Sequence, residues 1–317
     1  MNSENKMNIV KYTPDKAAEW DKLVRDSKNG TFLLERSYMD YHQDKFCDHS
    51  LMLYKKGHLL AVLPANVSGD TVYSHQGLTY GGLILSAKAA MVDVLDAFEC
   101  INAYYRAEGC RKMVYKPIPY IYHTMPSQED LYALFRMKGA KLVSRGISST
   151  LYQDNKIAFT ESRKSGIRKA MREGVVVKES EDVEAFWNVL NSNLMDRYGL
   201  SPVHTAVELA MLKERFPDNI KLYVAERDSE VVGGTLLFVT RQVVHTQYIA
   251  PSLEGKKVGA LDALFDYLIN VKYADYPVFD FGISTEQQGR VLNESLIFQK
   301  EGFGGRGTVY DVYEYEL

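Results

Sequence analysis

Apolar and polar positions along the chain switch repeatedly between the helical and the strand period. In the N-terminal half, Val94, Leu95, Phe98 and Ile101 recur at the spacing of one helix face. The run 113–120 then reads as a strand that leaves into a proline-containing turn. The pattern therefore predicts a helix followed by a strand.

A second helix and a return strand are predicted directly after this pair. Leu131, Leu134 and Phe135 fall on one helix face, and the helix is expected to end near Gly139. Residues 141–153 then have the pattern of strand.

The C-terminal half repeats this order of elements. A helical stripe covers residues 261–269, a strand 277–281, a helix 291–298 and a closing strand 306–317. One order of elements recurring at one long offset predicts an internal duplication into two similar domains. A coincidental alternation of helices and strands is the alternative.

Three strand patterns separated by short polar turns precede that repeat in the second half. They cover residues 220–228, 230–241 and 242–252. Such short connections require antiparallel pairing, because parallel neighbours need a long crossover. The helix pattern of residues 182–200 precedes these strands. Together they predict an α/β fold with a mixed (α+β) sheet and helices on both of its faces.

Composition and charge agree with an ordinary globular protein. The chain has 317 residues, enough for two domains of about 150 residues each. It is 46% hydrophobic and 25% charged, and its formal net charge is −3. A broadly basic surface that binds nucleic acid non-specifically is therefore excluded, so any contact with a polyanion must be local.

The cysteines and the N-terminal residues are those expected of a protein in a reducing compartment. Cys47, Cys100 and Cys110 are odd in number and never spaced as C-x-x-C, so we expect buried thiols, no disulfide and no metal site. The first twelve residues lack an apolar signal segment, and no apolar run reaches the roughly 20 residues that span a bilayer. The sequence predicts a cytoplasmic protein without a membrane span.

Three stretches carry a resemblance to a known family. They are RKSGIRKAMREGVVV (163–177), FDFG (279–282) and NESLIFQKEGFGG (293–305). With the predicted order of elements, the chain resembles the GNAT acyltransferase fold in duplicate, as in the Fem cell-wall aminoacyl-transferases and the FemAB-like acetyltransferases. Gln299 stands where the Fem pattern usually has phenylalanine.

The resemblance implies two tandem GNAT-like domains and a transferase. The boundaries that we expect are 1–154 for the N-terminal domain, 155–174 for a basic helical linker and 175–317 for the C-terminal domain. The function implied first is an N-acyltransferase that passes an acyl group from acyl-CoA to an amine acceptor bound between the domains. The alternatives are an aminoacyl-tRNA-dependent transferase acting on a peptidoglycan precursor, and a non-catalytic binding module.

The donor loop of the GNAT fold has an incomplete counterpart here. GNAT enzymes hold the pyrophosphate of coenzyme A on backbone N–H groups at a helix start, in a Gln/Arg-x-x-Gly-x-Gly/Ala loop. The corresponding residues are Gly255, Lys256, Lys257, Gly259 and Ala260, with Lys257 at the first glycine position. Two lysines attract phosphate as point charges. Both donors, acyl-CoA and aminoacyl-tRNA, therefore stay open.

Lys300 is the leading catalytic candidate. It corresponds to the lysine of the Fem motif, whose charge is thought to assist the transfer, and acyl transfer needs a group that stabilises the developing oxyanion. The alternative is a lysine that complements the dipole at a helix end. Glu294 is the candidate for the general base, with a solvated surface carboxylate as its alternative.

Polar residues after the predicted strand 277–281 are candidates for substrate binding, because ligands usually bind at the carboxyl ends of strands in α/β sheets. Arg290 is suited to a carboxylate or phosphate. Ser284 and Asn293 are candidates beside it. The alternative is that Ser284 or Thr285 caps the following helix.

Aromatic and histidine side chains give a second group of substrate-binding candidates. His75 and Tyr80 lie among glycines where the Fem family builds part of its acceptor pocket, and Tyr248 lies on the third predicted meander strand. The alternative for each is a half-buried sheet residue.

The linker carries the chain's concentrated basic stripe. Its residues are Arg163, Lys164, Arg168, Lys169 and Arg172. Lys164, Arg168 and Arg172 share one helix face and are suited to a local tRNA contact, or form a solvated face. The sequence has no Ser-His-Asp order, P-loop, Rossmann glycine run or HExxH motif, so no residues support a hydrolase, a kinase or a dehydrogenase.

Overall fold

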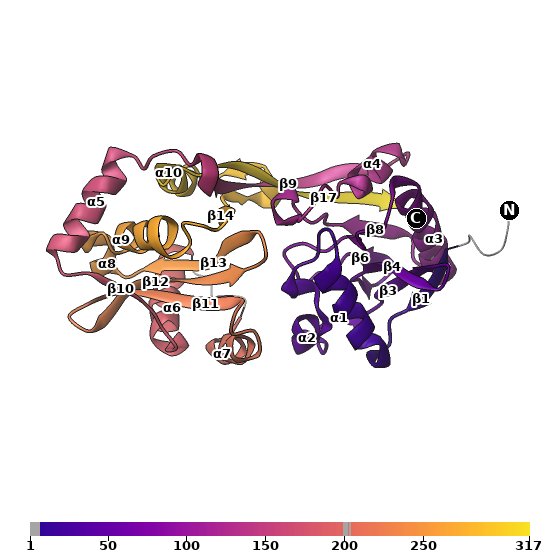
Figure 1. The fold of residues 1–317 in the computed structure, drawn as a ribbon, viewed down its shortest axis with the longest axis horizontal. Helices are drawn as coiled ribbons and strands as arrows, with labels where there is room; N and C mark the ends of the chain where they lie inside the picture. Colours follow the sequence, from indigo (N-terminus) through magenta and orange to yellow (C-terminus); the bar gives the residue numbers. More distant parts are fainter. Residues whose placement is uncertain (1–6, 199–201, 203) are drawn as a thin grey trace. The chain divides into compact units, whose positions relative to one another are not determined.

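The structure is a computed structural model that describes residues 7–198, 202 and 204–317. It is a mixed α/β protein whose chain divides into two compact units. The sequence pattern predicted this class, and the alternation of helices and strands is confirmed (Figure 1).

The two units are interleaved along the chain. Unit 1 comprises the residues up to Gly146 together with Thr285–Val291 and Val309–Leu317. Unit 2 comprises Ile147–Ser284 and Leu292–Thr308. The sequence had suggested two continuous domains instead, with the last strand assigned to the C-terminal one.

The meander predicted in the second half forms the centre of unit 2. Its strands are β11 (Ile220–Arg227), β12 (Glu230–Val239) and β13 (Val243–Pro251). Successive strands pair antiparallel, as the short turns require, and β10 (Val176–Glu179) extends the sheet beyond β11.

The next strand, β14 (Val278–Ile283), runs parallel to β13, but the two pair over only three rungs. The pairing begins at Val243 opposite Val278 and ends at His245 opposite Asp280. Beyond that last rung no backbone pairing joins the two strands, although β13 continues to Pro251 and β14 to Ile283. The sheet of unit 2 is therefore open between them.

Helices cover both faces of the unit 2 sheet. Figure 1 shows α6 (Val183–Tyr198) and α7 (Ala206–Arg215) on one side of β11 to β13, and α9 (Ala260–Tyr267) on the other. The short α8 (Leu253–Val258) precedes α9. The linker forms helix α5 (Glu161–Arg172), which packs against α9.

The core of unit 2 on the α9 side is aromatic. Phe279 and Phe281 of β14 pack with Phe265 of α9, and Phe303 stacks on Phe281. Each such buried side chain contributes about 1.5–3 kcal/mol by leaving water. Because strand residues alternate, Asp280 projects to the opposite face, toward α6 and α7.

The helix predicted at residues 291–298 begins later than expected. Val291–Leu292 form the short strand β16, which pairs with β15 (Thr285–Glu286), and α10 spans Glu294–Gly302. The side chain of Asn293 accepts a hydrogen bond from the Leu296 N–H at 3.1 Å and so starts the helix. This cap fixes the boundary that apolar spacing alone placed too early.

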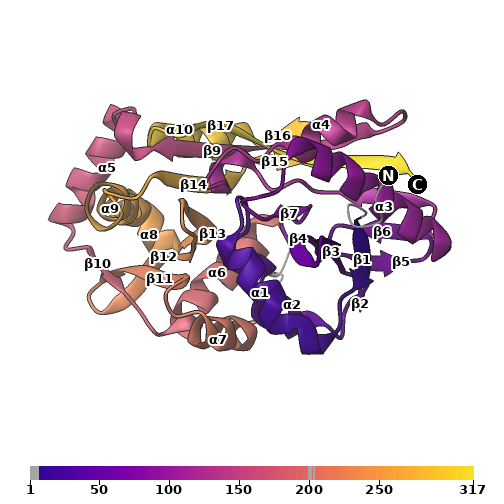
Figure 2. The ribbon, with the colours of Figure 1, turned by 45° about the vertical axis from the view of Figure 1, so that its right-hand side comes forward.

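Unit 1 contains a four-stranded antiparallel sheet in the order β1-β3-β4-β7. Its strands are β1 (Asn8–Lys11), β3 (Leu51–Lys55), β4 (His58–Leu63) and β7 (Ile84–Leu85). Helix α1 (Ala17–Asp26) contacts β4 and β7, and α3 (Met91–Ala107) contacts β1 (Figure 2). The predicted helix stripe of Val94, Phe98 and Ile101 lies in α3 and is buried.

Further strands of unit 1 follow the order β17-β8-β6-β5-β2. Their bounds are β2 (Cys47–Asp48), β5 (Asn66–Ser68), β6 (Thr71–Tyr73), β8 (Lys112–Tyr115) and β17 (Arg306–Glu316). Helix α4 (Glu129–Arg136) packs on α3, as the second predicted helix of this half.

The last strand of each repeat pairs within the other unit. Strand β9 (Lys141–Tyr152) follows α4 along the chain, yet its second half pairs antiparallel with β14 in unit 2. The end of β17 pairs antiparallel with β8 in unit 1, from Tyr313 opposite Tyr115 to Glu316 opposite Lys112. This exchange explains why the units are interleaved in the sequence.

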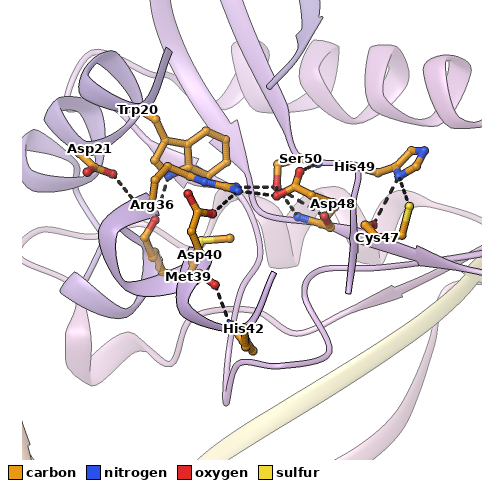
Figure 3. A network of polar contacts seen from close by, with 12 residues as sticks. Trp20, Asp21, Arg36, Met39, Asp40, His42, Cys47, Asp48, His49 and Ser50 are labelled. Atoms are coloured by element: carbon orange, nitrogen blue, oxygen red, sulfur yellow. Dashed lines mark hydrogen bonds and ion pairs between the residues drawn. The ribbon is translucent and has the colours of Figure 1, made fainter. Parts of the chain in front are cut away.

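A polar network around Arg36 connects α1, the short helix α2 (Arg36–Met39) and β2 of unit 1. Figure 3 shows the guanidinium bonded to Asp40 at 2.5 Å and to Asp48 at 2.6 Å. The same group lies 3.8 Å from the ring centroid of Tyr12 and 5.4 Å from that of Trp20. A buried cation that is held by two carboxylates and two rings serves the packing of this unit.

All three cysteines are free thiols in the structure. Cys110 is buried and Cys100 partly so, but Cys47 is exposed, which corrects the expectation of three buried thiols. Across residues 7–198, 202 and 204–317, no helix is both long and apolar enough to cross a membrane.

Candidate active site

A pocket of about 540 Å³ lies in unit 2 where β13 and β14 separate. Ile249 of β13 and Phe281 of β14 contribute to its walls, one from each side of the opening. Both residues lie beyond the last paired rung of the two strands. The pocket therefore occupies the gap that the missing strand pairing leaves.

Charged side chains give this pocket an excess of positive charge. Lys256 of α8, Arg163 of α5 and Lys300 of α10 line it, and Asp262 of α9 is the anion among the lining residues. Arg163 Nη1 donates to Asp262 Oδ1 at 2.7 Å, which leaves the two lysines without a carboxylate in the lining. Such a surface attracts an anionic ligand group.

Lys300, the leading sequence candidate, lies in this pocket and is buried. Its Nζ donates to the carbonyl oxygens of Gly282 at 2.8 Å and Ile283 at 2.9 Å, at the end of β14 where the pairing with β13 has stopped. An ammonium group has three donors, so one N–H is left for a ligand. Burial lowers the pKa of Lys300 to about 8, although the charge of Asp280 acts in the opposite direction.

A histidine and an aspartate form the last paired rung before the opening. His245 Nδ1 lies 2.7 Å from Asp280 Oδ2, and the hydroxyls of Ser148 and Thr150 on β9 donate to Asp280 Oδ1. Burial alone would raise the pKa of Asp280, but these hydrogen bonds and the nearby imidazole hold it below the ordinary value. A charged carboxylate is thus maintained with no solvent exposure.

Sequence reasoning did not select this pair as a site. His245 and Asp280 are 35 positions apart on two strands, and only the rung between β13 and β14 brings them together. The available signal was the single buried-strand aspartate of FDFG, because an aspartate inside an apolar strand needs a partner.

The residues predicted to hold the donor's phosphates divide into two groups. Gly255, Lys256 and Gly259 line the pocket. Lys257 does not: its side chain is 74% exposed and pairs with Glu254 at 3.6 Å. Ala260 is buried and packs in the core of the helix start.

Several backbone N–H groups around this loop are bonded within the chain. Ser252 Oγ accepts from the Gly255 N–H at 2.9 Å, and the Ser252 carbonyl accepts from the Lys256 N–H at 3.0 Å. The Gly259 carbonyl accepts from the Asp262 N–H at 3.0 Å. The N–H groups of Gly255, Lys256 and Asp262 are therefore already used and do not face an anion.

Helix α5 covers the start of α9. A Cβ on Gly259, which has a φ of +78°, would lie 2.6 Å from the carbonyl oxygen of Gly166. A Cβ on Gly166 would lie 2.1 Å from Asp262 Oδ2. The two glycines thus allow the linker helix to approach the helix start directly, and burial raises the pKa of Asp262 there although Arg163 lowers it.

The polar residues around the start of α10, which were predicted to bind substrate, lie outside the lining of this pocket. Asn293 is the N-cap of α10, so the cap is not Ser284 or Thr285 as the alternative interpretation had it. Glu294 is exposed in the first helical turn, and Arg290 is exposed in the β15–β16 turn. Ser284 is buried, with a hydroxyl that has no partner among the described residues. None of the four lines the pocket at the strand opening.

The first-half candidates are buried in unit 1. Tyr80 OH lies 3.1 Å from Thr31 Oγ1, and its ring packs on Tyr122. His75 has a φ of +67°, and its Nδ1 is buried without a partner in the described part of the chain. Burial and the neighbouring His42 lower the pKa of His75 to about 3, so it is neutral. Whether they bind an acceptor stays a prediction.

Tyr248 shares a sheet face with His245. A β-bulge between Thr246 and Tyr248 places Tyr248 opposite Leu236 and His245 opposite Phe238. Leu236 and Phe238 are two positions apart on β12, so His245 and Tyr248 lie on the same face. Tyr248 OH lies 2.7 Å from His204 Nδ1, and its ring meets Trp187 edge to face. This face carries α6 and α7 and is the one opposite the pocket lining of Phe281.

The linker stripe forms α5 as predicted. Arg163 turns inward to Asp262, and Arg168 pairs with Glu161 on the surface. Lys164, Lys169 and Arg172 are exposed. In the described residues no group of three or more His, Cys, Asp or Glu side chains is arranged to hold a metal ion.

Comparison with known proteins fits this geometry. Residues 160–288 match the model of the acetyltransferase (GNAT) domain family. FemX superposes with a TM-score of 0.68 at 13% identity, covering 98% of this chain and 97% of that one. The chain therefore has the fold of FemX, and residues 160–288 contain a GNAT domain.

Two further solved structures superpose on nearly the whole chain. L-PGS from Bacillus licheniformis has a TM-score of 0.62 at 13% identity, with 96% of this chain and 92% of that chain covered. A conserved protein of unknown function from Bacteroides thetaiotaomicron has a TM-score of 0.59 at 11% identity, covering 98% and 99%. No curated protein sequence matches the chain.

Proposed function

We propose that this tandem GNAT protein is an acyltransferase that passes an activated acyl group to an amine, with the donor bound in the unit 2 pocket. The observation that carries the proposal is the opening between β13 and β14, with Lys300 fixed at its edge. An acyl carbonyl in the opening would have the free N–H of Lys300 beside it, and a fixed cation stabilises a developing oxyanion.

Acyl-CoA is the first donor candidate. Its pantetheine arm contains amide groups, and the unpaired edge of β13 after His245 offers peptide groups of the same kind. Lys256 and Arg163 are suited to its phosphates as side-chain cations, and the N–H groups of Gly255 and Lys256 are already bonded within the chain. The acceptor is then an amine, and its neutral form attacks the thioester carbon.

Aminoacyl-tRNA is the second candidate, and the covered helix start favours it. Gly166 of α5 lies against Gly259, where the family's coenzyme A loop needs open amides. The phosphates of a tRNA donor do not need the helix start. They could contact the exposed cations of α5, which are Lys164, Lys169 and Arg172.

Titration of the full-length protein with acetyl-CoA tests the first donor. Binding stabilises the fold by about 2.7 kcal/mol at a concentration 100-fold above Kd, so the melting temperature should rise. Lys256→Met should weaken binding, whereas Lys257→Met is the matched control, because the neighbouring lysine is exposed and outside the pocket. Equal effects of the two changes would contradict the assignment of the pocket.

Charged tRNA tests the second donor in the same way. Phosphate contacts make log K fall linearly with log salt, by about 0.9 for each neutralised phosphate of a duplex. Replacing Lys164, Lys169 and Arg172 together should reduce that slope. If a donor binds but no amine is ever acylated, the protein is a non-catalytic binding module.

A further inference from the structure

The last rung between β13 and β14 carries a histidine whose second nitrogen is unused. His245 Nδ1 faces Asp280 Oδ2 at 2.7 Å, and a carboxylate only accepts, so Nδ1 carries the proton. In the neutral imidazole, Nε2 is then an acceptor. The His245 side chain is 12% exposed, and Nε2 is not one of the fully buried polar atoms without a partner in the described residues. Nε2 is therefore accessible to solvent.

Asp280 is built to keep the imidazole in this orientation. It has no solvent exposure, and it also accepts from the hydroxyls of Ser148 and Thr150. Three donors from two flanking strands therefore fix a single carboxylate. A buried charge costs several kcal/mol unless it is bonded in this way, so a purely structural position would favour an apolar residue.

Gly282 of β14 lies between the His245–Asp280 pair and Lys300. Gly282 accepts the Lys300 Nζ hydrogen bond on its carbonyl. A Cβ on the same glycine would lie 3.3 Å from His245 Cε1, so the imidazole edge and the ammonium group flank Gly282. The charge of Asp280 also acts to raise the pKa of Lys300, against the effect of burial.

The two groups approach the strand opening from different faces. Lys300 lines the pocket on the side of α9 and Phe281. His245 shares the opposite face with Tyr248, toward α6 and α7. A donor in the pocket thus has a cation on its own side, and an amine that enters from the other face meets an imidazole.

We propose that His245 is the general base of this acyltransferase and that Asp280 is its positioning residue, with the amine acceptor bound on the face of β13 that carries His245 and Tyr248. This inference rests on the proposed function. His245 Nε2 takes a proton from the substrate ammonium, and the amine nitrogen then forms a bond to the acyl carbon. The bond from that carbon to the donor's sulfur or oxygen breaks, the leaving atom takes a second proton from the nitrogen, and the imidazolium releases its proton to solvent.

A series of acceptors separates base catalysis from a structural role. A primary alkylamine such as free lysine is almost fully protonated at neutral pH, since its pKa is about 10.4, and it needs a base. Hydroxylamine is largely uncharged at neutral pH and does not. His245→Gln should lower kcat/KM for lysine by about 10²- to 10⁴-fold but should change it little for hydroxylamine.

Asp280→Asn and Thr246→Ser give the second test and its control. Asp280→Asn should show the same dependence on the acceptor, because the amide no longer fixes the tautomer with Nε2 free. Thr246 neighbours His245 on the other face of β13, so Thr246→Ser should leave the acceptor dependence unchanged. Added imidazole should partly restore a His245→Ala variant.

The outcomes of this experiment are distinct. If wild-type protein transfers no acyl group to either amine, the proposed function fails and the inference fails with it. If wild-type protein is active and His245→Gln loses the same factor with both amines, or none with either, the acyltransferase stands and the base assignment is overturned. Unchanged donor affinity in each variant confirms that the pocket is intact.

Discussion

The Nζ of Lys300 lies 2.8 Å from the carbonyl oxygen of Gly282, so the last turn of α10 is tied to the C-terminal end of β14. The pairing of β14 with β13 has ended there, while Ile283 still pairs with Ser148 of β9. Gly282 itself has a φ of +74° and lies in the irregular part of the β14–β9 ladder. The contact that ties α10 to β14 therefore also places a cation at the pocket.

Lys300→Met should remove most of the activity and little of the donor affinity. The side chain keeps its length and loses its charge, so the oxyanion loses a donor, which typically costs about 10²- to 10³-fold in kcat. Steady-state kinetics with Lys257→Met as control measures this effect. If kcat of Lys300→Met stays within a factor of two of the wild-type value, Lys300 is not a catalytic residue.

The pKa of Lys300 predicts a pH dependence of activity. With a pKa of about 8, the ammonium form is lost as pH rises through 8, and the rate should fall there. Lys300→Arg should keep its charge and lose this alkaline limb, even if its rate is lower. A limb that persists unchanged in Lys300→Arg would assign it to another group.

The same pKa has the opposite effect on stability. The ordinary value is 10.5 and the folded value about 8, so between these pH values the unfolded chain binds more protons. The contribution of Lys300 to stability therefore rises from pH 8 to 10.5, and its burial cost is present in full below pH 8. Because Lys116 also has a pKa of about 8, the difference between wild type and Lys300→Met in urea unfolding isolates the residue.

The fold was largely predictable because local patterns are strong where each element packs on one face. The meander of β11, β12 and β13 followed from apolar runs with short turns, and α3 from the spacing of Val94 and Phe98. The exchange of β9 and β17 between the units was not predictable, because either closing strand has the same pattern and only tertiary pairing decides.

The candidate site shows the same division. Lys300 was found because a motif marks it, and the structure places it in the pocket. His245 and Asp280 were missed because their contact depends on the register of a parallel pair. Asn293 was predicted to bind substrate, which stays a prediction, and the structure shows that it caps α10; both roles use a short polar side chain before an apolar run.

The cap predicts how Asn293 variants behave. Asn293→Ala should cost about 1 kcal/mol of stability, and Asn293→Asp should keep most of it, because aspartate caps a helix equally well. Urea unfolding measures this, and kinetics at saturating substrate should show little change for either variant. A large rise in KM with unchanged stability would restore the substrate-binding role.

The packing of α5 on α9 predicts a difference between two glycines of positive φ. Gly174→Ala should cost about 1–2 kcal/mol from backbone strain alone, because nothing lies near its Cβ position. Gly259→Ala should cost more, since its Cβ would meet the Gly166 carbonyl at 2.6 Å. Equal losses in chemical unfolding would show that the helix start is less tightly covered.

A structure of the protein with a bound donor analogue tests the central claim most directly. The account predicts that the acyl carbonyl lies in the opening between β13 and β14, within hydrogen-bond distance of Lys300 Nζ and bounded by Ile249 and Phe281. Density for the analogue in unit 1, or in unit 2 away from Lys300, would contradict it.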